Sequence, residues 1–211
     1  IEDVKKWILK AQEVCLSNGL TEVHDAGISS IQFDAYKELI NDGKLKIRVY
    51  AMANQELFEN NVSKYKSELF ELRSVKLVAD GALGSNGAAL IDQYQSLDTY
   101  GILILDKNKL KTLFLQAFKE DFQVCIHAIG DKTNREIVRA LREVLGNSDQ
   151  DQFDHRTRIE HAQIIKEEDI KEISDLNIIA SVQPMHCISD MDMAEERLGE
   201  RIKDSYLWKT L

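Results

Sequence analysis

Short apolar runs alternate with amphipathic windows along this chain. Apolar residues at helical spacing predict helices near residues 2–18, 31–41, 56–70, 107–120, 132–145 and 167–176. Six runs rich in aliphatic and β-branched residues lie between or after them, at 20–24, 45–52, 75–79, 123–127, 158–162 and 178–183. Strands that alternate with helices form parallel sheets with right-handed crossovers. Because no linker-like segment divides the chain, the pattern predicts one α/β domain over residues 1–211.

Two architectures fit this alternation. A closed (β/α)8 barrel of the TIM type needs eight βα units and about 250 residues, whereas this sequence of 211 residues supplies about six units. A doubly wound open sheet usually carries a dinucleotide-binding loop after its first strand, and none is present there. The pattern favours a partial TIM barrel, two strands short of closure, with the open sheet as the alternative.

Composition narrows the class of protein. The chain is 44% apolar and 30% charged, which is typical of a soluble globular protein. Its net charge of -9 argues against binding nucleic acid or an anionic membrane, because both need a basic patch. No apolar run approaches the roughly 18 residues of a membrane span. The cysteines are odd in number and Cys125 lies in an apolar run, which predicts free thiols and a cytoplasmic location.

Residues that could bind a metal lie where predicted strands end. His127 closes one apolar run, and His161 occupies the equivalent place one βα unit later. Side chains at the carboxyl ends of parallel strands converge on one face of the sheet. One such histidine could be a hydrogen-bonded core residue, but two in adjacent units favour a shared divalent metal.

Lys76 interrupts the apolar pattern of the run 75–79. A buried ammonium group is costly unless it is paired, neutralised or modified. Reaction with CO2 would convert Lys76 to a carbamate, an oxygen ligand able to bridge two cations. Pairing with Asp80 or a neighbouring acid would instead make Lys76 structural, and the residues alone leave both interpretations open.

The loop after this run has glycines at every third position, Gly81, Gly84 and Gly87. This spacing differs from the dinucleotide-binding fingerprint, and no clear helix follows it. A nucleotide-binding enzyme therefore rests on this loop alone, and we expect a flexible active-site loop instead.

The remaining histidines lie in different settings. His24 and His186 follow other predicted strands, so both could reach the same site, although a structural role for His24 is equally open. His155 lies in a charged stretch and is expected to be solvated. A nucleophilic mechanism has little support, because the sequence lacks a G-x-S-x-G elbow and Cys125 lies deep in its run.

Five segments, in order, resemble the amidohydrolase superfamily, and most closely its family 3, which includes N-substituted formamide deformylase-like enzymes. They are GLTEVHDAG at 19–27, VKLVADGALGS at 75–85, CIHAIGD at 125–131, RIEHAQ at 158–163 and SVQPMH at 181–186. The resemblance implies a barrel that holds one or two divalent ions, zinc being the expected metal, and hydrolyses C–N bonds. It implies Lys76, His127 and His161 as metal ligands, with Lys76 carboxylated.

The same resemblance suggests further roles at the site. We expect a small-molecule substrate to contact His186, Asp80 and Gly81. His24 and Asp131 are expected to contact the metal ligands without binding the ion themselves, and Asp131 also lies where it can cap the next helix.

Two departures from the family limit this interpretation. The sequence has no H-x-H pair, and it ends before the aspartate of the family's last strand, which serves as ligand and general base. We therefore expect a central fragment, strands two to seven of the barrel, and assign no catalytic residue. The functional hypothesis is a metal-dependent hydrolase of amide-type bonds; the alternative is an inactive structural or binding module. Open strand edges at 20–24 and 178–183 predict a homo-oligomer.

Overall fold

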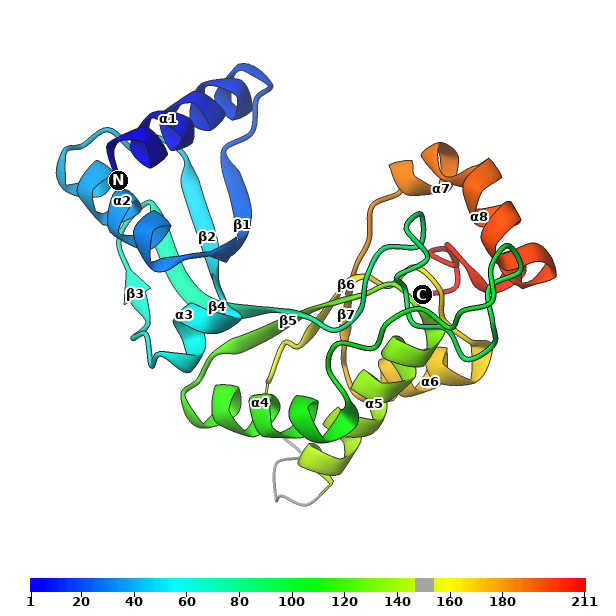
Figure 1. The fold of residues 1–211 in the computed structure, drawn as a ribbon. Coiled ribbons are helices and arrows are strands. Elements are labelled where there is room, and N and C mark those ends of the chain that lie inside the picture. Colours follow the sequence, from blue (N-terminus) through cyan, green and yellow to red (C-terminus); the bar gives the residue numbers. More distant parts are fainter. Residues whose placement is uncertain (147–153) are drawn as a thin grey trace. The chain divides into compact units, whose positions relative to one another are not determined.

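The computed structural model describes residues 1–146 and 154–211 (Figure 1). These residues form two compact units, Ile1–Leu77 and Val78–Leu211. The elements in chain order are α1 (Glu2–Ser17), β1 (Glu22–Ile28), α2 (Ser30–Asn41), β2 (Arg48–Asn54), α3 (Gln55–Glu59), β3 (Tyr65–Lys66), β4 (Phe70–Val78), α4 (Lys107–Lys119), β5 (Gln123–Ala128), α5 (Asp131–Leu145), β6 (Arg158–His161), α6 (Glu167–Asp175), β7 (Ile179–Ser181), α7 (Met185–Ser189), α8 (Met191–Leu198) and the 3-10 helix η1 (Gly199–Asp204). Within the described ranges, no helix has the length and apolar character needed to cross a membrane.

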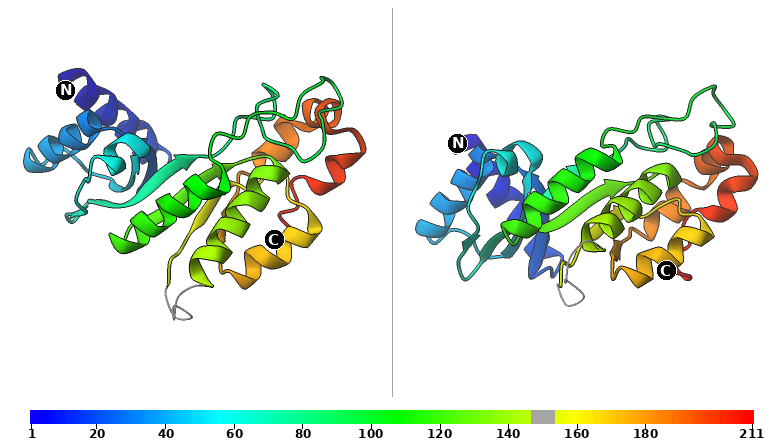
Figure 2. Two further views of the ribbon diagram at one scale, coloured as in Figure 1. Left: turned by 60° about the horizontal axis from the view of Figure 1, so that its bottom comes forward. Right: turned by 90° about the horizontal axis from the view of Figure 1, so that it is seen from below.

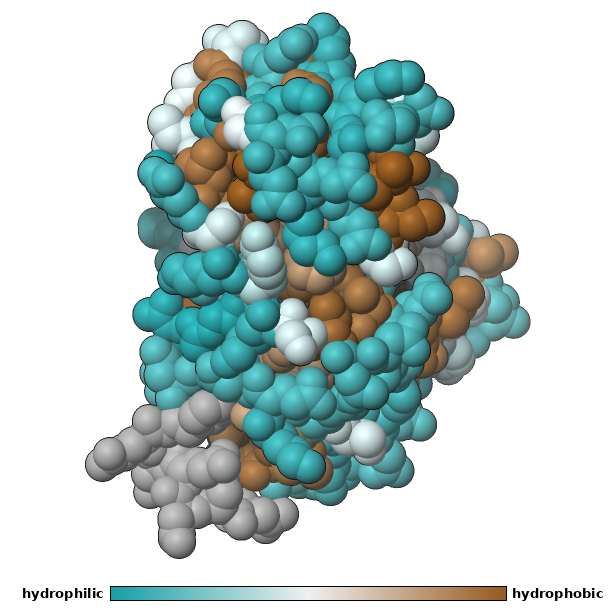
Figure 3. All heavy atoms as spheres, turned by 90° about the vertical axis from the view of Figure 1, so that its left-hand side faces the viewer, coloured by the Kyte–Doolittle hydropathy of each residue, from teal (hydrophilic) through white to brown (hydrophobic). Residues whose placement is uncertain are grey.

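The first unit is built on the parallel strands β1, β2 and β4, with β3 antiparallel to β4. Local sequence signals explain its helices. Ser29 caps α2 in a reciprocal capping box with Gln32, and Gly19 adopts a φ of 77° just after α1. On the face shown in Figure 3, brown apolar side chains interrupt a mostly hydrophilic surface.

One predicted helix of this unit is wrong beyond its first turns. The apolar spacing predicts a helix over 56–70, but α3 ends at Glu59 and the chain turns through Asn61, whose φ is 58°. Phe70 then begins β4, fully buried, with its ring centroid 4.8 Å from that of Tyr36 and 6.1 Å from that of Tyr65. This aromatic packing outweighs the local helical pattern, because it buries more apolar surface than an isolated helix would.

The second unit carries the parallel strands β5, β6 and β7. Figure 2 shows α4, α5 and α6 side by side over one face of these strands. Val124 and Ile126 of β5 are fully buried, as are Ile137 and Leu141 of α5. The helices predicted over 107–120, 132–145 and 167–176 are therefore present, and the strand ends that bear histidines lie next to each other.

Residues 81–104 lack regular helix or strand, yet they are packed. Leu83, Leu90 and Tyr94 are buried in one apolar cluster with Ala194 and Leu198 of α8. The Tyr94 hydroxyl donates to the Ala88 carbonyl at 2.8 Å. Part of this loop therefore has its own core, because these three side chains are buried against α8. That the loop is flexible and belongs to an active site stays a prediction.

Candidate metal centre

Two imidazole rings meet at the ends of β5 and β6. The centroids of the His127 and His161 rings lie 4.6 Å apart, with an interplanar angle of 73°. The strand register explains this closeness, since Ala128 pairs with His161 across parallel neighbours. The His127 side chain is 17% exposed, although its Nε2 atom is buried. The structure therefore brings together the two histidines that sequence analysis singled out.

The backbone at His161 is unusual. His161 has a φ of 81° and the next residue, Ala162, has a φ of 45°. Non-glycine residues seldom occupy this left-handed region, and where they do the strain often marks a functional site. β6 ends at His161 in this conformation.

Gln183 fixes the protonation pattern of the His161 ring. Its Oε1 lies 2.6 Å from His161 Nδ1, while its Nε2 donates to the Ser181 carbonyl at 3.2 Å. Because an amide oxygen can only accept, the proton sits on Nδ1 and the lone pair of His161 is on Nε2. Sequence analysis gave Gln183 no role, although it is the last residue of the predicted strand run 178–183.

Asp80 lies behind His127 and is fully buried. Its carboxylate accepts the backbone N–H groups of Ala89 at 3.1 Å, Ile129 at 3.1 Å and Gly130 at 2.8 Å. Its Oδ1 lies 3.5 Å from His127 Nε2. Burial raises the pKa of Asp80 to about 6, and the backbone hydrogen bonds act in the opposite direction. Asp80 is therefore mainly a carboxylate at neutral pH.

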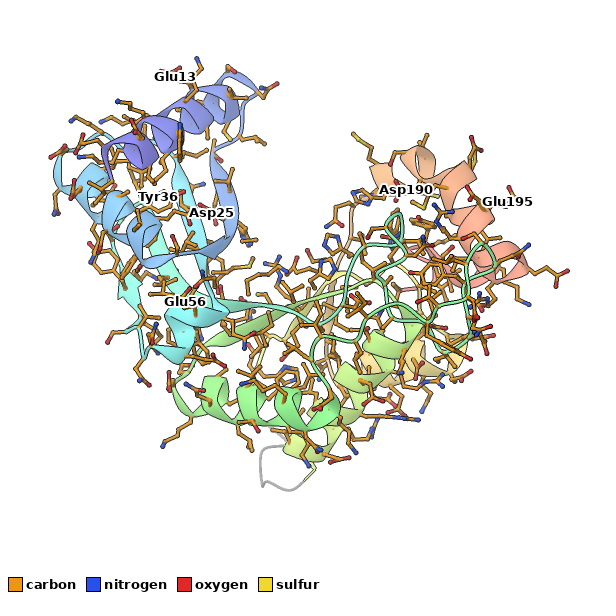
Figure 4. The ribbon with its side chains drawn as sticks, in the orientation of Figure 1. Glu13, Asp25, Tyr36, Glu56, Asp190 and Glu195 are labelled. Atoms are coloured by element: carbon orange, nitrogen blue, oxygen red, sulfur yellow. The ribbon has the colours of Figure 1, made fainter. Side chains whose placement is uncertain are left out.

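His186 approaches the pair from α7. Its ring is stacked near that of His161, with the centroids 6.3 Å apart, and its side chain is 43% exposed. Its Nδ1 lies 3.5 Å from a carboxylate oxygen of Asp190, which is labelled in Figure 4. Gly81 is less open, because its N–H donates to the Gly87 carbonyl at 3.1 Å. Substrate contact by these residues and Asp80 stays a prediction.

Asp131 is buried at the start of α5. Its Oδ1 accepts the N–H groups of Ile91 and Lys132, each at 2.9 Å, and its Oδ2 lies 3.8 Å from Lys166 Nζ. Burial raises the pKa of Asp131 while these partners act to lower it. Asp131 thus binds both the first turn of α5 and the packed loop.

Lys76 and His24 belong to the first unit. Lys76 is half-buried on β4, its Nζ donates to the Leu77 carbonyl at 3.2 Å, and its stem passes Gly27. His24 is exposed on β1, with its ring centroid 4.9 Å from that of Tyr50. That either residue joins the histidine pair stays a prediction.

A charged pair that sequence analysis missed lies on the strand next to His127. Arg158 Nε donates to Glu160 Oε1 at 2.8 Å and Arg158 Nη2 to Glu160 Oε2 at 3.0 Å. Both side chains are nearly buried, and Arg158 also donates to Ser181 Oγ at 3.2 Å. In the register, Glu160 is paired with His127. The bidentate pair makes a polar patch on the strands beside the histidines.

The expectation that His155 is solvated is wrong. His155 is 7% exposed, and its Nδ1 accepts the Thr157 N–H at 3.0 Å while its Nε2 lies 2.9 Å from the Leu176 carbonyl. Nε2 therefore carries the proton of a neutral ring. Burial lowers the pKa of His155. Its charged sequence neighbours concealed a structural histidine.

Comparison with known proteins decides the family. A sequence profile described as "Amidohydrolase family" matches residues 1–211. The chain belongs to this amidohydrolase family. Protein LONG AFTER FAR-RED 3 of Arabidopsis thaliana is 32% identical to it, covering 100% of this chain and 39% of that protein. The putative amidohydrolase YtcJ of Bacillus subtilis (strain 168) is 29% identical, covering 99% of this chain and 40% of that protein.

Solved structures agree with this membership. An uncharacterized metal-dependent hydrolase from Pyrococcus furiosus is 31% identical, with a TM-score of 0.87 over 98% of this chain and 43% of that chain. One from Pyrococcus horikoshii OT3 is 30% identical, with a TM-score of 0.88 over 100% and 43%. The match confirms the predicted fold class, a partial α/β barrel of the TIM type. This amidohydrolase-family chain spans about two-fifths of the curated relatives.

The donor set suits part of a metal centre in an amidohydrolase. Neutral imidazoles are good ligands for zinc and similar divalent ions, and the centroids of these two rings lie 4.6 Å apart. Across residues 1–146 and 154–211, however, no group of three or more His, Cys, Asp or Glu side chains is placed to hold an ion. That His127 and His161 are two ligands of a larger set stays a prediction.

Proposed function

We propose that this chain contributes His127 and His161 to the divalent-metal centre of a hydrolase that cleaves amide-type C–N bonds in a small molecule. The observation that carries the proposal is the pair of imidazole rings 4.6 Å apart at adjacent strand ends. Membership of the amidohydrolase family supports the bond type. Structural relatives described as metal-dependent hydrolases support a metal, with zinc as the expected ion in one or two copies.

Each residue has a defined part in this proposal. His161 would bind the ion through Nε2, because Gln183 holds the proton on Nδ1. Carboxylated Lys76 is proposed as a further ligand, from the family resemblance. When bound, the ion would supply a Lewis acid for the carbonyl of the scissile bond. His186, which is 43% exposed beside His161, is placed to contact the substrate.

Metal analysis tests this proposal. The protein would be purified without chelators and its zinc and other divalent ions measured by mass spectrometry. We expect the full-length protein to hold one or two ions, and to lose them when His127→Ala and His161→Ala are combined. His186→Ala is the matched control and should keep the metal while impairing hydrolysis of amide substrates.

Two outcomes would oppose the proposal. Unchanged metal content in the double variant would show that the two histidines are not ligands. A metal-free wild-type protein, after zinc has been supplied, would favour the competing function, an inactive barrel segment that serves as a structural or binding module.

A further inference from the structure

Asp80, which lies just after β4, is hydrogen-bonded to two other segments of the second unit. One oxygen, Oδ2, accepts N–H groups from Ala89 in the packed loop and from Gly130 in the turn after β5. The other, Oδ1, accepts the Ile129 N–H. Hydrogen bonds to an ionised acceptor are stronger than those between neutral groups. A single buried carboxylate thus holds the loop against the two residues that follow Ala128.

The same carboxylate faces the His127 ring. Oδ1 lies 3.5 Å from Nε2, and the carboxylate is wholly shielded from solvent. A negative charge beside one ring nitrogen stabilises a proton on that nitrogen, and the lone pair then sits on the other. For His127, the proton is expected on Nε2 and the lone pair on Nδ1.

We propose that Asp80 is a positioning residue, which couples the packed loop 81–104 to His127 and holds the neutral ring with its proton on Nε2. The proposal rests on the proposed function in one respect, since Nδ1 would be the nitrogen offered to a metal. Asp80 itself makes no bond to substrate in this role. Its effect on the ring can be measured without any metal.

The variant Asp80→Asn tests whether the carboxylate sets the tautomer of the His127 ring. Two N–H donors, from Ala89 and Gly130, meet at the Oδ2 position, so the amide oxygen of the variant should take that place. The amide nitrogen would then take the Oδ1 position, where it faces His127 Nε2 as a donor and can no longer accept the Ile129 N–H. The ring would have to accept there, which moves its proton to Nδ1.

Asp131→Asn is the matched control. Asp131 is also a buried aspartate that accepts an N–H of the packed loop, that of Ile91 at 2.9 Å. Its partners are the N–H groups of Ile91 and Lys132 and the ammonium group of Lys166, and not the His127 ring. The control should therefore loosen the loop without moving the proton of His127.

The experiment is long-range 1H–15N NMR of chelator-treated protein, at a pH where the imidazoles are neutral. The wild type is expected to show His127 with Nε2–H, Asp80→Asn with Nδ1–H, and Asp131→Asn with Nε2–H. In parallel, hydrogen exchange should accelerate about tenfold or more at Ile129, whose N–H loses its acceptor, in Asp80→Asn and at Ile91 in Asp131→Asn.

Either of two results would overturn the proposal: a wild-type ring with Nδ1–H, or an unchanged Nε2–H ring in folded Asp80→Asn. If circular dichroism shows that Asp80→Asn does not fold, the tautomer of the His127 ring in the wild type still tests the proposal. Failure of the proposed function is distinct, because it would appear as absent metal while the tautomer remained as stated.

Discussion

Gly130→Ala tests the close approach that joins the packed loop to the end of β5. A Cβ atom at Gly130 would lie 1.9 Å from the Ala89 carbonyl oxygen and 2.5 Å from its carbon, both backbone atoms. The two segments must separate by about 1 Å before such a contact becomes tolerable, since real Cβ contacts under 3.0 Å are essentially never observed. That separation stretches the 2.8 Å hydrogen bond from Gly130 to Asp80.

The expected cost combines two effects. Overpacking costs about 1–3 kcal/mol, and weakening a buried hydrogen bond to a carboxylate adds about 1.5–3 kcal/mol. We therefore expect Gly130→Ala to lower the free energy of unfolding by roughly 2.5–6 kcal/mol. Urea unfolding followed by circular dichroism measures it, with the midpoint and slope compared to the wild type.

Gly84→Ala is the control for the same substitution in the same region. Its Cβ would lie 3.7 Å from the Cε of Met193, an ordinary contact with a flexible side chain. Its free energy of unfolding should stay within about 0.5 kcal/mol of the wild type. If Gly130→Ala were as stable as Gly84→Ala, the tight junction between the loop and the turn would be refuted.

Three further predictions concern polar side chains. Burial lowers the pKa of His155, so the unfolded chain binds more protons than the folded one and stability should fall as pH drops below about 6.5. Thermal melts measured across this pH range should show a shallower fall in stability for His155→Gln, and an equal fall would contradict the prediction. Arg158→Met strands the nearly buried Glu160 carboxylate and should cost about 3–5 kcal/mol in urea unfolding, clearly more than Arg158→Met combined with Glu160→Leu. Gln183→Leu removes the acceptor at His161 Nδ1 and should weaken metal binding about 10–100-fold in a competitive chelator titration, so unaltered affinity would exclude that positioning role.

Much of the fold was predictable because its signals are local. The apolar face of α5 repeats at helical spacing, and the strand runs contain buried aliphatic residues such as Val124 and Ile126. The helix predicted over 56–70 failed because its outcome depended on Phe70 packing against Tyr36. That contact joins residues far apart in sequence, so no local period reveals it.

The residues of the site also fall into those that the sequence could predict and those that it could not. His127 and His161 were predictable because ending a parallel strand places any side chain at one edge of the sheet, whatever the loops do. Gln183 and Asp80 act through contacts across 22 and up to 50 residues of sequence, with His161 and Gly130 respectively. Their residue types alone do not indicate these partners.

The packing of residues 81–104 determines which segments around the histidine pair can move. Opening residues 81–104 would break the bond from Ala89 to Asp80 and that from Ile91 to Asp131, and would expose the buried Tyr94. Short α7 presents the opposite case, because Met185 and Ile188 are 77% and 80% exposed beside His186. Elements with little buried apolar surface open at low free-energy cost. We therefore expect the loop held by the two buried carboxylates to open less readily than the segment that carries His186.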